Sequence, residues 1–176
     1  KENIMRNQNV KKIVLSAIFI SLVFVATYIG IPWPFSSGGY MHLGTLVLLI
    51  IAITFGKEYG ALAGGVGMGL FDLLSPYAMW APGTFIVRLL MGYIVGMVAY
   101  DIKKKEQGTN ILLNIMAIVC GAAVMIPGYY FYEAFFLTDF KASFASIPGN
   151  LIQFTLGAFS LGFLQKILLI KQIQDL

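Results

Sequence analysis

The sequence contains few charged residues, one histidine and one cysteine. Asp, Glu, Lys and Arg make up 11% of the 176 residues, whereas a typical soluble domain contains about 25%. Hydrophobic residues account for 59% of the chain, which argues against a water-soluble globule. The lone Cys120 cannot form a disulfide within the chain, and a single histidine leaves little acid–base chemistry near neutral pH. The composition predicts an integral membrane protein.

Motifs of common enzymes are also absent. The sequence has no GxxxxGKS or GxxxxGKT phosphate loop, no HExxH or GxSxG motif and no cluster of Cys and His. The glycines from Gly65 to Gly69 do not form a dinucleotide-binding fingerprint, because Leu70 stands where the third glycine is required. Positive charges are not interleaved with aromatic residues, so nucleic acid is not an expected partner. We expect neither an enzyme nor a bound cofactor or metal ion.

Long uncharged runs predict six membrane-spanning helices in a single domain covering residues 1–176. A helix needs about 20 mostly apolar residues to cross the hydrocarbon core. No Asp, Glu, Lys or Arg lies between Ile13 and Gly56, and a segment rich in Pro, Ser and Gly at 32–39 divides that run. We expect the first run to be retained, because it lacks a small-residue cleavage site and more spans follow. The predicted helices cover 10–30, 42–56, 59–75, 82–101, 110–137 and 146–170.

The positive charges support an even number of spans. Cytoplasmic segments of membrane proteins are enriched in Lys and Arg. With six spans, one side receives ten of the twelve positively charged residues. The other side receives only Lys141, and Arg88 falls inside the fourth helix. The distribution predicts that both termini are cytoplasmic.

Polar side chains gather near the outer ends of the predicted helices. Charged groups within a membrane are rare, and they usually mark a site or an internal ion pair. An ion pathway would require polar groups through the full thickness, but the inner halves of the helices have almost none. The pattern therefore predicts a cup that opens outward above a sealed floor. Its candidate polar residues are Asp72, Arg88, Glu133, Asn150 and Gln153, with His42 at the mouth of the second helix.

Aromatic residues occur at the same level. Trp80 and Tyr129 stand next to the polar positions and are candidate walls for a flat heteroaromatic ligand. Tyr40 lies in the first outer loop with Trp33 and Phe35, for which an interfacial aromatic belt is an equally good interpretation. Two structural alternatives remain for the polar residues. Arg88 can form a packing ion pair with Asp72 or Glu133, and Asn150 and Gln153 can form interhelical hydrogen bonds.

Small residues recur every four positions on three helices. The pairs are 60/64, 61/65 and 65/69 on the third helix and 92/96 on the fourth, and such spacing allows close helix packing. Ala17 and Ser21 form a similar pair on the first helix, on a face that continues to Val25. This face can serve internal packing or docking to another membrane subunit.

Six segments carry a resemblance to a known family, namely Gly39-Tyr-Met-His-Leu-Gly-Thr, Phe55-Gly-Lys-Glu-Tyr-Gly-Ala, Asp72-Leu-Leu-Ser, Trp80-Ala-Pro-Gly-Thr-Phe-Ile-Val-Arg, Gly128-Tyr-Tyr-Phe-Tyr-Glu and Pro148-Gly-Asn-Leu-Ile-Gln. With these segments, almost the whole chain resembles the substrate-binding S component of energy-coupling factor (ECF) vitamin transporters of prokaryotes. The resemblance is strongest to the group assigned to vitamin B6 compounds or to the thiamin precursor hydroxymethylpyrimidine.

The resemblance implies an all-α membrane fold with six helices and a high-affinity site facing outward. It also implies docking to a membrane coupling subunit that carries two ATPases. The family docks through a small-xxx-small face on the first helix, which maps onto Ala17 and Ser21; the family has alanine at both positions, so Ser21 departs from it. Transport in the family is thought to involve toppling of the S component within the membrane, and a sealed floor fits such a mechanism.

The functional expectation is capture of a small vitamin from outside the cell. Pyridoxine-type vitamin B6 is the first choice and hydroxymethylpyrimidine is the alternative. Trp80 and Tyr129 are expected to stack on the ring. The expected polar contacts come from Asp72, Glu133, Asn150 and Gln153, while Arg88 bonds a ring hydroxyl or holds a carboxylate in place, and Tyr40 and His42 complete the candidate site. The remaining alternatives are a membrane scaffold without a ligand, a self-sufficient carrier and an intramembrane enzyme, for which no nucleophile–base pair is found.

Overall fold

Six long helices make up most of the chain in the computed structural model, which describes residues 2–32, 40–101 and 111–168. The helices are α1 (Glu2–Thr27), α2 (Gly44–Phe55), α3 (Lys57–Leu73), α4 (Ala81–Gly96), α6 (Ile111–Phe136) and α7 (Ser146–Leu168). Each matches one of the helices predicted from the sequence. The largest difference is at the start of α1, which begins eight residues earlier than predicted, because its polar first turns lie outside the apolar run. Trp33 and Phe35 lie outside the described residues.

The expectation of a purely helical chain needs one correction. Strand β1 (Gly30–Pro32) pairs antiparallel with β2 (Tyr40–His42) in a small hairpin between α1 and α2. Strands of three residues are too short to produce a recognisable alternation in the sequence. Gly30 permits the close pairing, since a Cβ at this position would lie 2.8 Å from the His42 Cα. Three further short turns are η1 (Ala78–Trp80), η2 (Met97–Asp101) and η3 (Ala142–Ala145).

Glycines on α3 and α4 bring these two helices into backbone contact. A Cβ on Gly60 would lie 2.8 Å from the Gly92 carbonyl oxygen, and one on Gly64 would lie 3.0 Å from the Arg88 carbonyl oxygen. Gly65 approaches the Phe85 carbonyl oxygen in the same way. The small-xxx-small spacing on these helices thus serves internal packing. It also fixes the depth at which α4 presents Arg88.

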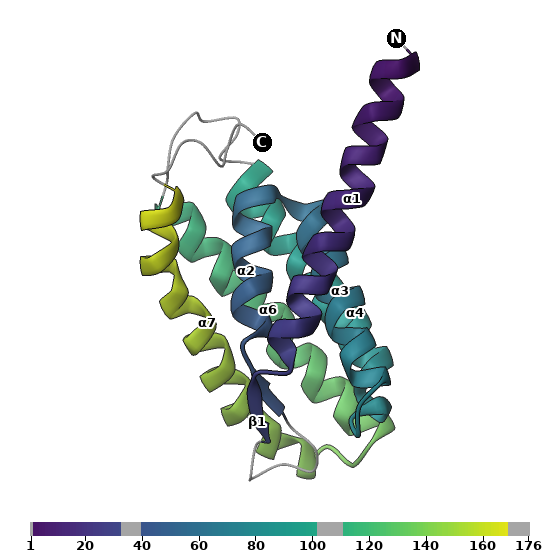
Figure 1. Cartoon of the computed structure of the whole chain (residues 1–176). Coiled ribbons are helices and arrows are strands. Elements are labelled where there is room, and N and C mark those ends of the chain that lie inside the picture. The colour runs from purple at the N-terminus through teal and green to yellow at the C-terminus, as the bar shows by residue number, and fades with distance from the viewer. Residues whose placement is uncertain (1, 33–39, 102–110, 169–176) are drawn as a thin grey trace.

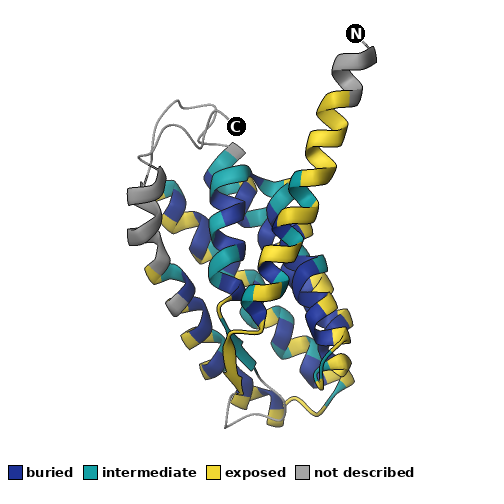
Figure 2. Cartoon of the chain, viewed as in Figure 1, coloured by how far each residue is buried: buried dark blue, intermediate teal, exposed yellow. Residues whose placement is uncertain are grey.

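The two ends of the helical bundle differ in character. The start of α1 and the end of α7 lie at one end, and the hairpin and η3 lie at the opposite end (Figure 1). Buried side chains line the inner faces of the helices, while α1 is exposed along much of its length (Figure 2). This placement of the chain ends agrees with an even number of spans. The side of the membrane on which they lie stays a prediction.

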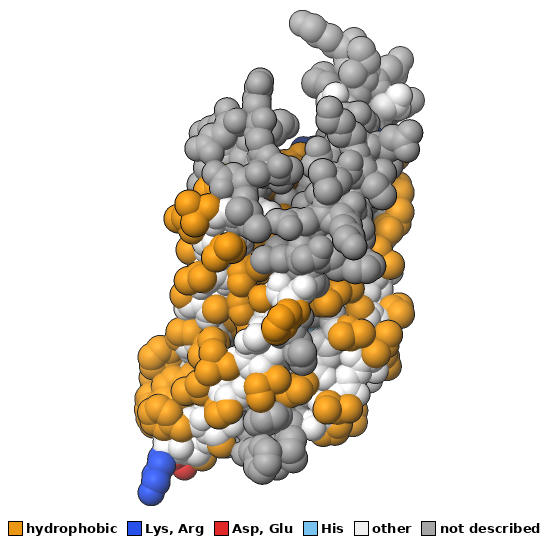
Figure 3. Space-filling view, turned by 90° about the vertical axis from the view of Figure 1, so that its left-hand side faces the viewer, with side chains coloured by type: hydrophobic (Ala, Val, Ile, Leu, Met, Phe, Trp, Pro, Cys, Tyr) orange, Lys and Arg blue, Asp and Glu red, His pale blue; other side chains and the backbone are white. Residues whose placement is uncertain are grey.

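The outer surface is rich in apolar side chains. Hydrophobic residues cover much of the face shown in Figure 3. Within the described part of the chain, three helical segments are long and apolar enough to cross a membrane, namely Asn7–Thr27, Ala78–Tyr100 and Leu112–Phe136. The first of them has only 22% of its most apolar window buried inside the protein. Such a surface is suited to lipid, whereas crossing by all six helices stays a prediction.

Candidate substrate-binding site

A pocket lies at the end of the bundle formed by β2 and the start of α7. The empty space within it is about 570 Å³, a value that includes space open to the surroundings. Six elements, namely β2, α3, η1, α4, α6 and α7, and the turn before η1 supply its walls. The lining residues are Tyr40, Met41, His42, Asp72, Tyr77, Trp80, Thr84, Arg88, Tyr129, Ser146, Gly149, Asn150 and Gln153.

Arg88 is the central polar residue of this pocket. Its side chain is 1% exposed, and its Nε donates a hydrogen bond to the Tyr129 hydroxyl at 3.0 Å. Its Nη1 donates to the Thr45 hydroxyl, also at 3.0 Å, and lies 3.6 Å and 3.3 Å from the sulfur atoms of Met91 and Met125. The guanidinium is therefore held by groups from α2, α4 and α6.

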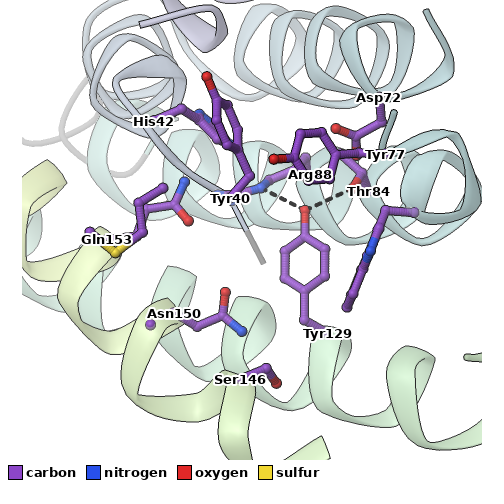
Figure 4. Close-up of a pocket in the computed structure, with 13 residues that line it drawn as sticks. Tyr40, His42, Asp72, Tyr77, Thr84, Arg88, Tyr129, Ser146, Asn150 and Gln153 are labelled. Atoms are coloured by element: carbon purple, nitrogen blue, oxygen red, sulfur yellow. Dashed lines mark hydrogen bonds between the residues drawn. The ribbon is translucent and has the colours of Figure 1, made fainter. Parts of the chain in front are cut away.

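The hydrogen bonds of Arg88 continue in both directions along the pocket. The Tyr129 hydroxyl donates to Thr84 at 3.1 Å, and Thr84 interacts with the Asp72 carboxylate. Figure 4 shows Tyr129 between Arg88 and Thr84, with Asp72 beside them. On the other side, Gln153 Nε2 donates to the Thr45 hydroxyl at 2.8 Å. One chain of polar contacts thus joins α3, α4, α6, α2 and α7.

The structural alternative, an ion pair between Arg88 and Asp72 or Glu133, is not part of this arrangement. Among the described residues, the ion pair that the structure forms is Lys12–Glu58, in which both side chains are exposed. Asp72 attracts Arg88 electrostatically, but the two do not reach the 4.0 Å of an ion pair. The alternative in which Arg88 only holds helices together requires an ion pair with a carboxylate, and the described residues do not form one.

Aromatic rings cover the pocket on the hairpin side. The Tyr40 ring lies 5.0 Å from the Tyr77 ring, 5.5 Å from Phe71 and 5.6 Å from His42, measured between centroids. The Tyr40 hydroxyl donates to the Tyr28 carbonyl oxygen at 3.2 Å. Burial raises the pKa of Tyr40, and Tyr77 adds to this effect. Burial lowers the pKa of His42 well below its usual value, and the positive charge of Arg88 acts in the same direction. His42 is therefore neutral near pH 7.

Trp80 and Tyr129 form the wall opposite the hairpin. Both are 7% exposed, and their ring centroids lie 6.2 Å apart. The indole N–H of Trp80 is buried without a hydrogen-bond acceptor among the described residues. Burying such a donor costs about 1–3 kcal/mol, a penalty that an acceptor on a ligand would remove.

The structure brings together eight of the nine side chains predicted as a binding site. Tyr40, His42, Asp72, Trp80, Arg88, Tyr129, Asn150 and Gln153 all line the pocket. Glu133 is buried at 1% exposure on α6, but it is not among the described residues that line the pocket. It lies four residues after Tyr129, more than one helical turn along α6. That the eight bind a substrate stays a prediction.

Sequence reasoning missed five of the lining residues. Met41, Tyr77, Thr84, Ser146 and Gly149 belong to the pocket but were not among the predicted contacts. For Thr84 a signal was present, because it lies four residues before Arg88 and so on the same helix face. Ser146 and Gly149 likewise share a face with Asn150 and Gln153. Met41 and Tyr77 lie outside the long helices and gave no periodic signal.

An apolar crevice adjoins the pocket. It is formed by the hairpin, the start of α2 and α7, and it has a free volume of about 800 Å³, part of it open. Met41, His42 and Gln153 line both spaces. The remaining lining residues are Ile29, Gly30, Ile31, Leu43, Leu46 and Gly157.

The predicted docking residues lie away from the pocket on α1. Ala17, Ser21 and Val25 are all exposed, and the Ser21 hydroxyl donates to the Ala17 carbonyl oxygen at 2.9 Å. This hydrogen bond lies within α1, so Ser21 adds no unsatisfied donor to the face. Internal packing does not occupy these three residues, which leaves docking or lipid contact.

Comparisons with known proteins point to one family. The sequence model of the family described as "ECF-type riboflavin transporter, S component" matches residues 7–170. A solved structure described as "Structure and mechanism of the S component of a bacterial ECF transporter" superposes with a TM-score of 0.67 and 23% identity, covering 92% of this chain and 96% of that one. At this identity the likeness shows the fold.

Two curated relatives add detail. An uncharacterized protein of Pyrococcus woesei is 34% identical over 99 residues, which are 56% of this chain and 62% of the relative, so the match spans less than two thirds of that protein. The thiamine precursor transporter HmpT of Lactococcus lactis subsp. cremoris is 26% identical over 155 residues, covering 88% of this chain and 85% of the relative.

Proposed function

Because the chain belongs to the family of ECF-type riboflavin transporter S components, we propose that it captures a thiamin precursor, hydroxymethylpyrimidine, at the pocket around Arg88. The observation that carries this proposal is the convergence of charged, amide, hydroxyl and aromatic side chains from separate helices on one buried pocket. Family membership makes the chain a transporter S component for a vitamin-like substrate. The identity of the vitamin and the roles of the residues are the proposal.

The chemistry of the pocket suits an aminopyrimidine. Its ring can pack against the wall that Trp80 and Tyr129 form together, since both side chains are buried and their rings contact each other. The amine and the hydroxyl of this compound can donate hydrogen bonds to the Asp72 carboxylate. Its ring nitrogens and hydroxyl oxygen are acceptors for Arg88 and for the amides of Asn150 and Gln153. A site with donors and acceptors at separate places favours a small dipolar ring.

The relatives rank the candidate vitamins. HmpT matches most of this chain and is named as a thiamine precursor transporter, which favours hydroxymethylpyrimidine over vitamin B6, our first choice from sequence. Pyridoxine shares the single ring and the hydroxymethyl group and becomes the second candidate. Riboflavin is the third, because the family description names it.

We further propose that the protein acts in the prokaryotic cell membrane with a coupling subunit and two ATPases. Family membership supports this partnership, and the exposed pair Ala17 and Ser21 on α1 offers a docking face with small side chains. The face lies on a different helix from the pocket, so docking and substrate binding can be altered separately.

The test is thermal unfolding and calorimetric binding of the purified protein against a panel of ring compounds. The panel contains hydroxymethylpyrimidine, pyridoxine, pyridoxal, pyridoxamine, thiamin and riboflavin. A ligand at 100 times its Kd stabilises by about 2.7 kcal/mol, so the true substrate produces a clear rise in Tm. Mass spectrometry of the purified protein identifies any vitamin that remains bound from the cells.

The outcomes separate the candidates. A shift with hydroxymethylpyrimidine alone supports the proposal, and a shift with another vitamin replaces the substrate while keeping the site. A protein that is free of copurified vitamin and responds to none of these compounds contradicts the proposal. It favours the scaffold alternative, in which the polar chain from Asp72 to Gln153 only holds helices together.

A further inference from the structure

Arg88 carries a positive charge, but all of its hydrogen-bond partners among the described residues are neutral, and Asp72 acts on it only from beyond ion-pair distance. Its hydrogen-bond acceptors are the hydroxyls of Tyr129 and Thr45 and two methionine sulfurs. Thioether sulfur is a weak acceptor. A buried cation normally requires a paired carboxylate, and none of the described carboxylates lies within 4.0 Å of it.

The position of the guanidinium is nevertheless fixed. Tyr129 on α6 and Thr45 on α2 hold Nε and Nη1, and Gln153 on α7 holds Thr45. The residue also lines the pocket. A cation that is rigidly held, poorly compensated and adjacent to an open space is arranged for a partner that comes from outside the chain.

We propose that the ligand supplies Arg88 with a further hydrogen-bond acceptor, and that the pocket selects rings that present an acceptor at this edge. This inference rests on the proposed function and narrows it to a substrate class. The class comprises neutral or singly negative heteroaromatic rings that present a ring nitrogen or an oxygen to Arg88. A donor on another edge of the ring then bonds the Asp72 carboxylate. Rings with a cationic substituent at the Arg88 edge are rejected by charge repulsion.

The first test measures stability without any ligand. In Arg88→Met the charge is removed, and the new side chain lies beside the methionines that already contact this position, Met91 and Met125. The substitution leaves no acceptor or donor stranded, because the Tyr129 hydroxyl still donates to Thr84 and Thr45 still accepts from Gln153. We expect the Tm of the ligand-free variant to equal or exceed that of the natural protein.

A second variant keeps the test informative if Arg88→Met fails to fold. Arg88→Lys keeps the charge, and a lysine ammonium cannot reproduce the geometry of the guanidinium. Its ligand-free Tm is expected to fall below that of Arg88→Met. A clear fall in the Tm of Arg88→Met below that of Arg88→Lys would overturn the proposal, because it would mean that Arg88 stabilises the empty protein.

The third test compares pairs of ligands. Hydroxymethylpyrimidine is compared with analogues in which one ring nitrogen is replaced by CH, and pyridoxine is compared with pyridoxamine. Since a hydrogen bond to a charged group contributes about 1.5–3 kcal/mol, one CH analogue should bind about 10-fold to 100-fold more weakly to the natural protein. On Arg88→Met the difference within that pair should vanish. If the affinity ratio of the parent compound to its CH analogue is the same for the natural protein and for Arg88→Met, the inference is refuted, even when the ring binds.

The failures are distinguishable. If no ring compound binds, the proposed function is wrong, and the ligand-free comparison of Arg88→Met with Arg88→Lys still decides whether Arg88 stabilises the empty protein. If hydroxymethylpyrimidine binds but the CH analogues bind equally well, the proposed function stands and the assignment of Arg88 is wrong.

Discussion

Removing one hydroxyl group in Tyr129→Phe tests whether the polar chain through the pocket is a real structural link. The hydroxyl accepts from Arg88 Nε at 3.0 Å and donates to Thr84 at 3.1 Å, in a side chain that is 7% exposed. The aromatic ring and its contact with Trp80 are retained. The variant therefore isolates the two hydrogen bonds from stacking.

The expected loss follows from the kind of bond. A hydrogen bond to a charged group contributes about 1.5–3 kcal/mol in soluble proteins, whereas measured interhelical bonds in a membrane protein average about 0.6 and reach about 1.7 kcal/mol. Two bonds, one of them to a buried cation, place Tyr129→Phe near 1–2 kcal/mol of destabilisation. Arg88 then loses one of its two hydroxyl partners, so affinity for the ligand should also fall, by about tenfold.

The assay is thermal unfolding in detergent together with calorimetric titration of the ligand found in the panel. Tyr130→Phe is the matched control, because its hydroxyl donates at 3.2 Å to the Phe140 carbonyl oxygen in an exposed position. We expect the control to change stability by no more than about 0.5 kcal/mol. Equal Tm and equal affinity for the two variants would refute the reasoning that the chain is a connected unit.

Three further changes have directional outcomes. Gly92→Ala places a methyl group against the Gly60 backbone and should lower the Tm strongly. Gly69→Ala should be tolerated, because the nearest neighbour of its new Cβ is 3.4 Å away. Similar Tm values for the two variants would contradict the close contact between α3 and α4. Because His42 is kept neutral in the folded protein, the stability of the protein should fall as the pH drops below about 6.5. The Tm of His42→Gln, measured over the same pH range, should fall less steeply. An equally steep fall in the variant would contradict the role of His42. Ala17→Leu should abolish copurification with the coupling subunit at unchanged ligand affinity; full copurification would exclude this face.

The helices could be predicted because the membrane imposes a simple rule on sequence. Uncharged runs of about 20 residues, divided by Pro and Gly, define them without any knowledge of tertiary contacts. The hairpin from Gly30 to His42 follows no such rule. Three-residue strands depend on pairing across a turn, and this pairing leaves little trace in local hydropathy.

The position of the candidate site near the helix ends could be predicted, but the side chains that hydrogen-bond with its charged and amide residues could be predicted less well. Charged and amide residues near the helix ends are visible in an apolar sequence, and this is why Asp72, Arg88 and Gln153 could be identified. Thr45 is a small hydroxyl residue of a kind that occurs commonly in membrane helices, so nothing distinguished it, and the only signal for Thr84 was its spacing of four residues from Arg88. The sequence left open whether Arg88 pairs with a carboxylate, because charge alone does not tell which rotamers the helix contacts permit, and among the described residues no such ion pair forms.

The glycines and the arginine belong to one structural arrangement. A Cβ on Gly64 would lie 3.0 Å from the Arg88 carbonyl oxygen and closer still to the Leu48 side chain. Since Leu48 lies on α2, a larger residue at 64 would displace α4 and α2 together, and Arg88 would move relative to Thr45. The hydrogen bond between them is already 3.0 Å long, so a shift of a few tenths of an ångström would weaken it. The small face of α3 therefore determines the geometry of the pocket as well as the packing, although no glycine of α3 lines the pocket among the described residues.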